Sequence, residues 1–584
     1  MRNQKRFLLG TVFIFCVCAI IFIYNEKATV SKYLSEHSVI EDIYFVPQED
    51  EARKVYLLRN DIENIFHAYI TAKQDEQIKI YFNFCEKIII DGHELKNGNV
   101  LPELTEGQSY WIQAVDWTGE VCETEQVVFY FMPDVPTVFI TTNSGSMVEI
   151  NDNKEYEESA YFAVYTPQKV LDSLGECTVT GRGNSTWGKE QKPYSIDLVD
   201  AEDILGMEAT ADWALLCNYG NELPQLKNKV MFEIAQEMGI ENTPQSESVN
   251  LYLNGQYNGL YLLTQRININ DKSAGLSKKN DRTYLLEFDE RYEEEKNYFL
   301  TEKQSVVIKE PKIVSQAQAL NIEKLVSDAE RAIYNRDGMN QETGKHYLDY
   351  IDMDSWSKAF MIQNYFTQWD IEFASFYFYK PIGVEKFYAG PPWDFDMTCG
   401  KMYYGNYPKL SAHTLWIEDF KGKWLQNMVK HEEFQEYTRG QWLDNYSLAI
   451  SRVLTEEYGE IVKEFAPAVE MDKIRWNKAD KDFQGEADKL YDWLVKRQAF
   501  LDDYYANPEN YCAVTFEFAW GPIPYYVLKN TALNFLPCDK YGETDKYTSK
   551  FGYEDIVGWQ NAEGQEVSAD DIIEENVTYY PIYK

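Results

Sequence analysis

One short hairpin constrains the fold of this chain more than any other part of its sequence. Within residues 369–400, Phe376–Tyr379 has the aromatic content of a buried strand, and Pro381–Gly383 has the residues of a turn. A strand that turns back brings the two ends of the stretch together. We therefore expect Asp370, at the first end, to lie beside Asp394 and Asp396, at the second.

Three carboxylates in one place need a partner, because like charges repel. Asp370 ends a helical pattern, whereas Asp394 and Asp396 stand in the restricted sequence Pro391–Asp396. Mg²⁺ held by one or two carboxylates and by phosphate oxygens is the common solution. The pattern thus predicts a metal-dependent site of phosphoryl transfer. A buried structural ladder is the alternative, but burying two unpaired acids is costly.

The composition narrows the possible partners. With 56 Lys and Arg against 95 Asp and Glu, the chain has a net charge of −39 and would repel nucleic acid, which we exclude as a partner. An apolar content of 45% indicates folded cores. The nine cysteines show no metal-type spacing. Cys85 with Cys122, and Cys512 with Cys538, are either disulfides or free thiols.

The first 24 residues have the pattern of a membrane anchor. Arg2, Lys5 and Arg6 precede an uncharged apolar run that continues to Tyr24. About 18 helical residues span roughly 27 Å, close to the thickness of the bilayer core. Positive charge before the run predicts a single-pass membrane protein with its N-terminus in the cytoplasm and its bulk outside. A cleaved signal peptide is the competing interpretation, but no small-x-small cleavage site follows the run.

Residues 25–48 read as a polar spacer, and residues 49–135 predict a small β-sandwich of immunoglobulin-like type. Short alternating runs such as Ile78–Phe82 and Tyr110–Val115 are separated by turn residues such as Asp91-Gly92. We expect a spacer or binding module without catalysis. A longer region with both helix and strand patterns, 137–510, follows and contains the hairpin.

A glycine-rich turn in this longer region is a candidate anion-binding site. The sequence Gly181–Trp187 precedes a strand pattern at Ser195–Leu198. Backbone N–H groups of such a turn can bind an anion, with positive charge from Arg182 and Lys192 and a polar side chain from Asn184. A structural turn with a weak surface ion pair is the alternative.

Several motifs, in one order, resemble the spore-coat protein H (CotH) kinase family. They extend over most of residues 137–510 and are Gly181–Trp187, Lys192–Tyr194, Leu205–Leu216, Asn254–Tyr257, Tyr284–Asp289 and Pro392–Asp396. The resemblance implies an atypical protein kinase. It also implies ATP and Mg²⁺ as cofactors, and protein substrates at the cell surface or spore coat.

By analogy with protein kinases, the resemblance implies a role for each candidate residue. Asp370 would act as the base that positions the acceptor hydroxyl. Asp394 would be the main metal ligand, with Asp396 and Ser375 as further ligands. The residues that would bind the nucleotide are Arg182, Asn184, Lys192 and Lys227.

Four positions depart from the family pattern: Ser375, Gln265, and also Asn221 and Lys227, near which Asp and Arg are more usual. The first two keep other functions open. Ser375 stands where Asn is usual, although its hydroxyl can bind Mg²⁺, and Gln265 stands where Glu is common. A catalytically silent surface scaffold is therefore one alternative. A carbohydrate-active enzyme is another, because the chain has 44 Tyr, 14 Trp and paired carboxylates. A glycosidase, however, does not need the positive charges of Arg182 and Lys192.

Residues 511–584 resemble a small β-grasp repeat of Gram-positive surface proteins, the Listeria–Bacteroides type (InlB B-repeat-like). The motifs are Val514–Phe516, Leu536-Pro537, Gly558-Trp559 and Asn576–Tyr580. The resemblance implies a stalk or adhesive unit. The expected fold class is therefore α+β: a transmembrane helix at 1–24, a β-sandwich, an atypical protein-kinase-like domain and a β-grasp module.

Overall fold

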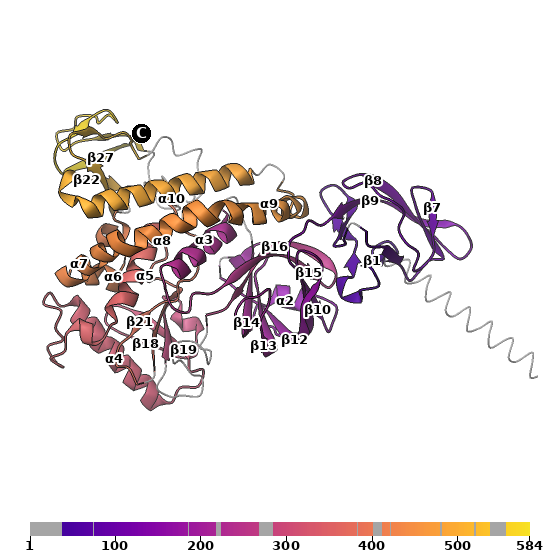
Figure 1. Ribbon diagram of the computed structural model, residues 1–584, viewed down its shortest axis with the longest axis horizontal. Coiled ribbons are helices and arrows are strands. Elements are labelled where there is room, and N and C mark those ends of the chain that lie inside the picture. The colour runs from indigo at the N-terminus through magenta and orange to yellow at the C-terminus, as the bar shows by residue number, and fades with distance from the viewer. Residues whose placement is uncertain are drawn as a thin grey trace, which may run out of the picture.

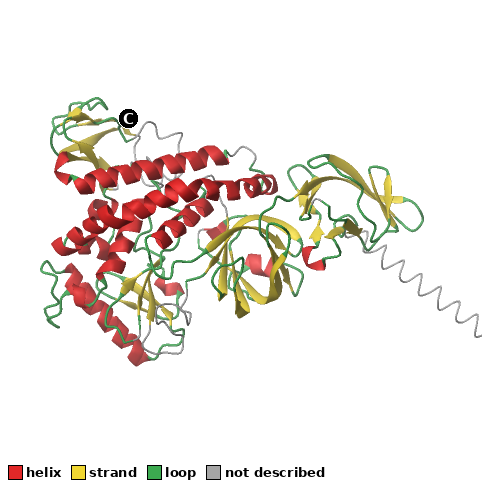
Figure 2. Ribbon diagram, viewed as in Figure 1, coloured by secondary structure: helices red, strands yellow, loops and turns green. Residues whose placement is uncertain are grey.

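The computed structural model arranges the chain as a strand-rich N-terminal region, a β-barrel and a larger helical part (Figure 1). Figure 2 shows the long helices gathered at the end opposite the N-terminal region. The structure describes residues 38–73, 75–184, 186–217, 223–267, 284–381, 383–400, 412–420, 422–478, 482–518, 521–537 and 556–583. The predicted anchor at 1–24 lies outside these ranges. Within them, no helix combines the length and apolar character needed to cross a membrane.

Two sheets form the N-terminal region around one hydrophobic core. One has the strand order β2 (Val55–Tyr56), β1 (Tyr44–Pro47), β5 (Ile78–Tyr81). The other has the order β3 (Leu58–Asn60), β4 (Ile65–Ile70), β9 (Val121–Phe131), β8 (Ser109–Val115), β6 (Lys87–Ile90), β7 (His93–Leu95). The core also contains Val39 and Phe45, which lie within the predicted spacer. Cys85 and Cys122 are free thiols.

A closed barrel follows. Its strand order is β10 (Thr137–Thr142), β11 (Glu158–Tyr165), β12 (Leu171–Gly181), β13 (Tyr194–Glu202), β14 (Thr210–Cys217), β16 (Gln256–Gln265), β15 (Ser246–Leu253). The parallel pair β10–β15 closes it, and the short helix α2 is Val148–Asp152. The turn between β15 and β16 is Asn254-Gly255, with positive φ at both residues. This is the backbone that favours Asn-Gly in two-residue hairpins.

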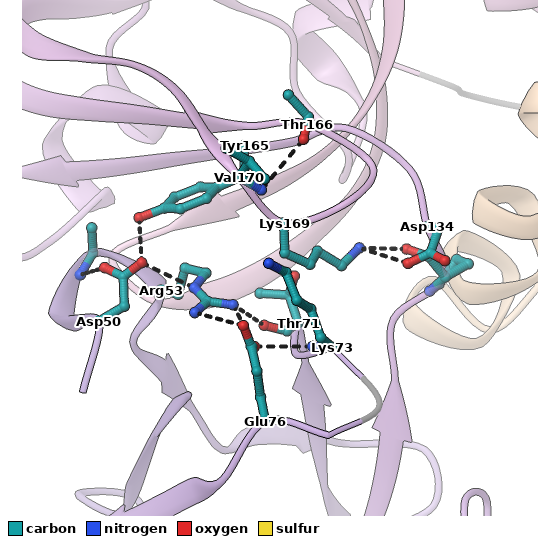
Figure 3. A network of polar contacts seen from close by, with 12 residues as sticks. Asp50, Arg53, Thr71, Lys73, Glu76, Asp134, Tyr165, Thr166, Lys169 and Val170 are labelled. Carbon is teal, nitrogen blue, oxygen red and sulfur yellow. Dashed lines mark hydrogen bonds and ion pairs between the residues drawn. The ribbon is translucent and has the colours of Figure 1, made fainter. Parts of the chain in front are cut away.

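Polar contacts dock the N-terminal region onto this barrel (Figure 3). The buried Arg53 forms ion pairs with Asp50 at 3.0 Å and with Glu76 at 2.7 Å. The hydroxyl of Tyr165, on barrel strand β11, donates to the same Asp50 carboxylate at 2.8 Å. Each charged group in the junction therefore has a partner, as burial requires.

Aromatic residues complete the junction. The ring of Tyr69 lies 4.8 Å from the ring of Tyr257, and the hydroxyl of Tyr252 donates to the Tyr69 carbonyl at 2.6 Å. The backbone N–H of Tyr56 donates to the carbonyl of Gly255 at 2.9 Å. The tip of the β15–β16 hairpin is thus in direct contact with the N-terminal region.

A further, five-stranded sheet and most of the helices share the largest core. The sheet has the order β18 (Tyr298–Leu300), β19 (Ser305–Glu310), β17 (Tyr284–Phe288), β20 (Phe376–Lys380), β21 (Tyr388–Ala389). Trp356 of α5 (Met353–Phe366) and Trp424 of α6 (Trp424–Met428) stack on each other and contact Phe378 of the sheet. The same part contains the longer helices α3 (Pro224–Glu237), α4 (Gln316–Tyr334), α7 (Glu432–Gln441), α9 (Tyr458–Arg475) and α10 (Phe483–Ala506), and the short helix α8 (Ser447–Arg452).

The C-terminal residues form a small β module against the helices. Its sheet has the order β23 (Gly521–Leu528), β22 (Tyr511–Phe518), β27 (Val577–Tyr583), β25 (Ile556–Gln560), beside the pair β24 (Thr531–Ala532) and β26 (Ile572–Ile573). Its apolar residues belong to the largest core, and the backbone N–H of Tyr526 donates to the backbone carbonyl of His413 at 2.8 Å. Cys512 is a buried free thiol, and Cys538 lies outside the described residues. The β-grasp assignment stays a prediction.

Candidate functional site

The segment that carries Asp370 begins where α5 ends. Thr367 has a left-handed backbone, with φ of 50°, and its N–H caps the helix by donating to the carbonyls of Asn364 and Gln363. The helix thus stops before Asp370, which the sequence pattern had placed at its end. The N–H of the next tryptophan, Trp369, donates to the Met397 carbonyl at 3.0 Å. This bond holds the Asp370 segment against the loop at the far end of the hairpin.

Gln368 joins the two carboxylate segments through its buried side-chain amide. Its Oε1 accepts from the backbone N–H of Asp370 at 3.3 Å, and its Nε2 donates to the backbone carbonyl of Asp394 at 2.7 Å. The Gln368 carbonyl in turn accepts from the indole of Trp416 at 2.6 Å. This amide therefore sets the spacing of the Asp370 and Asp394 backbones. The sequence pattern gave no indication of this role for Gln368.

The carboxyl groups at the two ends of the hairpin act on one another. Desolvation by the surrounding protein raises the pKa of Asp394 to about 8, and the negative charges of Asp396 and Asp370 add to this increase. The residue nevertheless keeps part of its surface exposed. The positive charges of Arg182 and Arg291 work in the opposite direction. Because the effects that raise the pKa of Asp394 exceed those that lower it, this carboxyl group is ionised near neutral pH only when a further cation lies beside it.

Helix α3 supports the loop that carries Asp394. Asn228 accepts from the backbone N–H of Phe395 at 2.9 Å. The ammonium of Lys227 donates to the carbonyls of Asp396 at 3.3 Å and Thr398 at 3.1 Å. Lys227, a predicted nucleotide-binding residue, is therefore placed on backbone carbonyls of this loop.

Ser375 lies between the sheet and Asp394. Its hydroxyl is 3.5 Å from Asp394 Oδ2, and its backbone N–H donates to Glu287 Oε1 at 3.0 Å. Glu287 is buried and forms an ion pair with Lys309 at 3.3 Å. The φ of Ser375 is 58°, a left-handed value that Asn and Gly tolerate better than Ser.

The oxygen donors at this site suit Mg²⁺ bound together with a phosphate ligand. Among the described residues, no group of three or more His, Cys, Asp or Glu side chains has the spacing of a complete metal centre. The oxygen-bearing side chains predicted as ligands are the carboxylates of Asp394 and Asp396 and the hydroxyl of Ser375. Mg²⁺ usually takes one or two carboxylates and completes its shell with water and phosphate oxygens. These residues therefore fit an ion that arrives with a nucleotide.

Arg182, directly after β12, has a desolvated guanidinium that forms no ion pair within 4 Å among the described residues. Burial lowers the pKa of its guanidinium to about 10. Its Nη1 is buried and has no hydrogen-bond partner within the described part of the chain. The guanidinium lies over Trp393, 5.2 Å from the ring centroid. Because an unpaired buried charge is costly, this geometry favours an anionic ligand beside Arg182.

The other two candidates in this turn are placed differently. The ammonium of Lys192 donates to the Trp187 carbonyl at 2.7 Å and lies 4.5 Å from the centroid of its ring. Asn184 is exposed, and its carbonyl accepts from the Trp187 N–H at 3.2 Å. A Cβ on Gly181 would come within 2.4 Å of the Trp187 ring, so the turn requires glycine there. The turn is thus built around Trp187.

Gln265 has a structural role at the rim of the barrel. Its Nε2 donates to the Glu208 carbonyl at 2.6 Å, and its Oε1 accepts from the Gln245 N–H at 3.0 Å. An ionised glutamate has no donor for the first of these bonds. The amide therefore matches its surroundings in this chain.

The comparisons with known proteins agree with this description. The sequence model of the CotH kinase protein family matches residues 179–501, which include the barrel end, α3, the hairpin and the helices around it. The match defines a kinase-like protein of mixed α/β fold. The chain belongs to the CotH kinase protein family.

Two further comparisons give no basis for assigning the site. No curated protein matches the chain. Among solved structures, the crystal structure of the Helicobacter pylori proinflammatory kinase CtkA matches 56% of this chain and 96% of its own. The identity is 10% and the TM-score is 0.25. A likeness this distant gives no information about the present fold or chemistry.

Proposed function

We propose that this chain is an atypical protein kinase that transfers the γ-phosphate of ATP to Ser, Thr or Tyr hydroxyls of surface or spore-coat proteins, including itself. The observation that supports this most is that acidic and basic groups lie near one another. The carboxyl groups of Asp370, Asp394 and Asp396 repel one another, and the charge of Arg182 acts on Asp394. The Nη1 group of Arg182 is buried and has no hydrogen-bond partner among the described residues. A nucleotide with Mg²⁺ suits both kinds of group, because its phosphates would accept from the guanidinium and its cation would offset the carboxylate charge.

In this proposal each residue has one task. The acceptor oxygen forms a bond to the γ-phosphorus, the bond from that phosphorus to the β–γ bridging oxygen breaks, and ADP leaves with the electron pair. Asp370 accepts the proton of the hydroxyl. Asp394, Asp396 and Ser375 would hold Mg²⁺, which neutralises phosphate oxygens when bound. Arg182 binds phosphate and needs no reorganisation to do so.

We also propose that the protein is a single-pass membrane protein that acts outside the cytoplasm. The anchor would be residues 1–24, with modules at 49–135, 137–510 and 511–584, the last a β-grasp surface repeat. The positive charges before the apolar run support this orientation. Alkylation of single cysteines, placed before residue 7 and after residue 40, by a membrane-impermeant reagent on intact cells tests it. Labelling of the first position, or of neither, would contradict it.

The kinase proposal is tested with the full-length protein, γ-labelled ATP and Mg²⁺. We expect label in the wild type and a loss of at least about 100-fold in Asp394→Asn and Arg182→Ala, the size seen when one charge-stabilising group is removed from an active site. Lys192→Ala is the matched control from the same turn. It should lose less, since its ammonium binds Trp187. No label, together with no Mg²⁺-dependent ATP binding by calorimetry, would leave the silent scaffold as the better description.

A further inference from the structure

A second arginine, Arg291, lies beside the segment that carries Asp370. It follows β17, and its guanidinium is 6.0 Å from the ring of Phe373. The N–H of Phe373 donates to the carbonyl of Asp370 at 2.9 Å. Among the arginines in the described ranges, Arg182 and Arg291 are the two that have a buried N–H group without a hydrogen-bond partner: Nη1 of Arg182 and Nε of Arg291.

Hydrogen bonds hold the backbone around Arg291, whereas Nε of its guanidinium has no hydrogen-bond partner among the described residues. Its N–H donates to Asp289 Oδ1 at 2.8 Å, and the neighbouring N–H of Glu290 donates to the carbonyl of Phe373 at 2.8 Å. These bonds hold the Arg291 turn against the segment that carries Asp370. Within the described part of the chain, Arg291 forms one ion pair, from Nε to Asp289 Oδ1 at 3.9 Å, which is too long for a hydrogen bond. The ion pair therefore leaves the donors of the guanidinium available.

The two arginines differ in depth. Arg182 has a desolvated guanidinium and lies against the buried ring of Trp393. The Arg291 side chain is 37% exposed and lies 6.0 Å from the ring of Phe373, which is itself 44% exposed. Solvent, and hence a protein acceptor, can therefore reach the Arg291 guanidinium and the ring of Phe373 beside it.

We propose that Arg291 is a further phosphate-binding residue that contacts the terminal phosphoryl group of the nucleotide, on the side from which the acceptor enters. This inference rests on the proposed kinase function and assigns Arg182 to the inner phosphates. A guanidinium suits the position because it donates several hydrogen bonds in one plane to phosphate oxygens. A surface ion pair with Asp289 is the alternative, and it would contribute little.

Calorimetry with the full-length protein separates these possibilities, because ADP lacks the terminal phosphoryl group. Mg²⁺·ATP and Mg²⁺·ADP are titrated into the wild type, Arg291→Ala, Arg291→Lys and Arg182→Ala. We expect Arg291→Ala to weaken ATP binding roughly 10- to 100-fold, the effect of losing a charge-assisted hydrogen bond, and to change ADP binding less than about 3-fold. Arg291→Lys should recover part of the ATP affinity. Arg182→Ala should weaken both nucleotides.

The matched control is Arg331→Ala, because Arg331 on α4 is similarly exposed, at 41%, and is paired with Asp328 and Glu342. It should change neither affinity. Equal weakening of ATP and ADP by Arg291→Ala, or no weakening of either, would overturn the inference and leave the kinase proposal intact. A wild type that binds neither nucleotide would overturn the kinase proposal, and the role of Arg291 with it. Thermal unfolding of every variant shows whether a loss reflects misfolding.

Discussion

Replacing Gln368 by glutamate tests whether one amide sets the spacing of the two carboxylate segments. Glutamate keeps an oxygen to accept from the Asp370 N–H but loses Nε2, which donates to the Asp394 carbonyl at 2.7 Å. When ionised, the new side chain would place a negative charge next to that carbonyl and near the acidic cluster. When protonated, it could donate to the carbonyl as the amide does. The damage should therefore depend on pH.

The size and the sign of the effect follow from the same contacts. A buried carbonyl left without its donor costs about 1–3 kcal/mol. Burial near Asp370, Asp394 and Asp396 should raise the pKa of the introduced glutamate in the folded state above its unfolded value near 4.3. The folded state then binds the proton more tightly. Stability of the variant, relative to the wild type, should fall as pH rises from about 4.3 through the raised value and stay low above it.

Hydrogen exchange of peptides covering residues 367–375 and 394–400 measures this effect locally. At pH 8, exchange in Gln368→Glu should be roughly 5- to 150-fold faster than in the wild type, which corresponds to 1–3 kcal/mol. At pH 5 the excess should shrink. Gln498→Glu is the control, since Gln498 Nε2 also donates to a carbonyl, that of Ser447, at 2.7 Å. Wild-type exchange at pH 8, or an excess that does not change with pH, would refute the reasoning.

Three further predictions use other parts of the structure. Ser375→Asn should increase stability and tighten Mg²⁺ binding, because Asn tolerates the φ of 58° and adds an amide oxygen; a calorimetric titration without tightening would argue against it. Burial raises the pKa of Glu372 from 4.5 to about 7, so the free energy of unfolding should fall by about 3 kcal/mol as pH rises from 4.5 to 7. In Glu372→Gln, the free energy of unfolding measured with urea should depend less on pH over this range, and an equal pH dependence in the two proteins would contradict this. Arg53→Met, which breaks the buried ion pairs of Figure 3, should cost about 3–5 kcal/mol in urea unfolding. Arg331→Met, at an exposed pair, should cost less than about 1 kcal/mol, and similar losses in the two variants would refute the argument.

Local patterns allowed part of the fold to be predicted from the sequence. Phe376–Tyr379 was expected to be a strand and forms β20, because its aromatic side chains need a buried sheet. The Asn254-Gly255 turn was expected from its positive-φ preference and joins β15 to β16. The hairpin brings the two ends of the stretch together, and the charges of Asp370 and Asp396 accordingly raise the pKa of Asp394.

Features that depend on contacts distant in sequence were not predicted. Closure of the barrel by β10 and β15 has no local signature. Arg291 lies among the acids of residues 289–295, where its charge looks like a local ion pair. The hydrogen bond from the Lys192 ammonium to the Trp187 carbonyl was not predicted either, because it depends on how the turn folds. The roles of the candidate residues, which include Arg182, Asn184, Lys192 and Lys227, stay predictions.

The closure of the barrel by β10 and β15 has a consequence for the order in which the chain folds during synthesis. The sheets of the N-terminal region are complete once β9 leaves the ribosome at Phe131. The barrel, in contrast, keeps the unpaired backbone of β10 exposed until β15 arrives with Leu253. Open strand edges of this kind invite pairing with other chains. The hairpin of β15 and β16 also brings Tyr252 and Gly255 to the N-terminal region. Formation of this hairpin therefore covers the open edge of β10 and docks the barrel onto the N-terminal region.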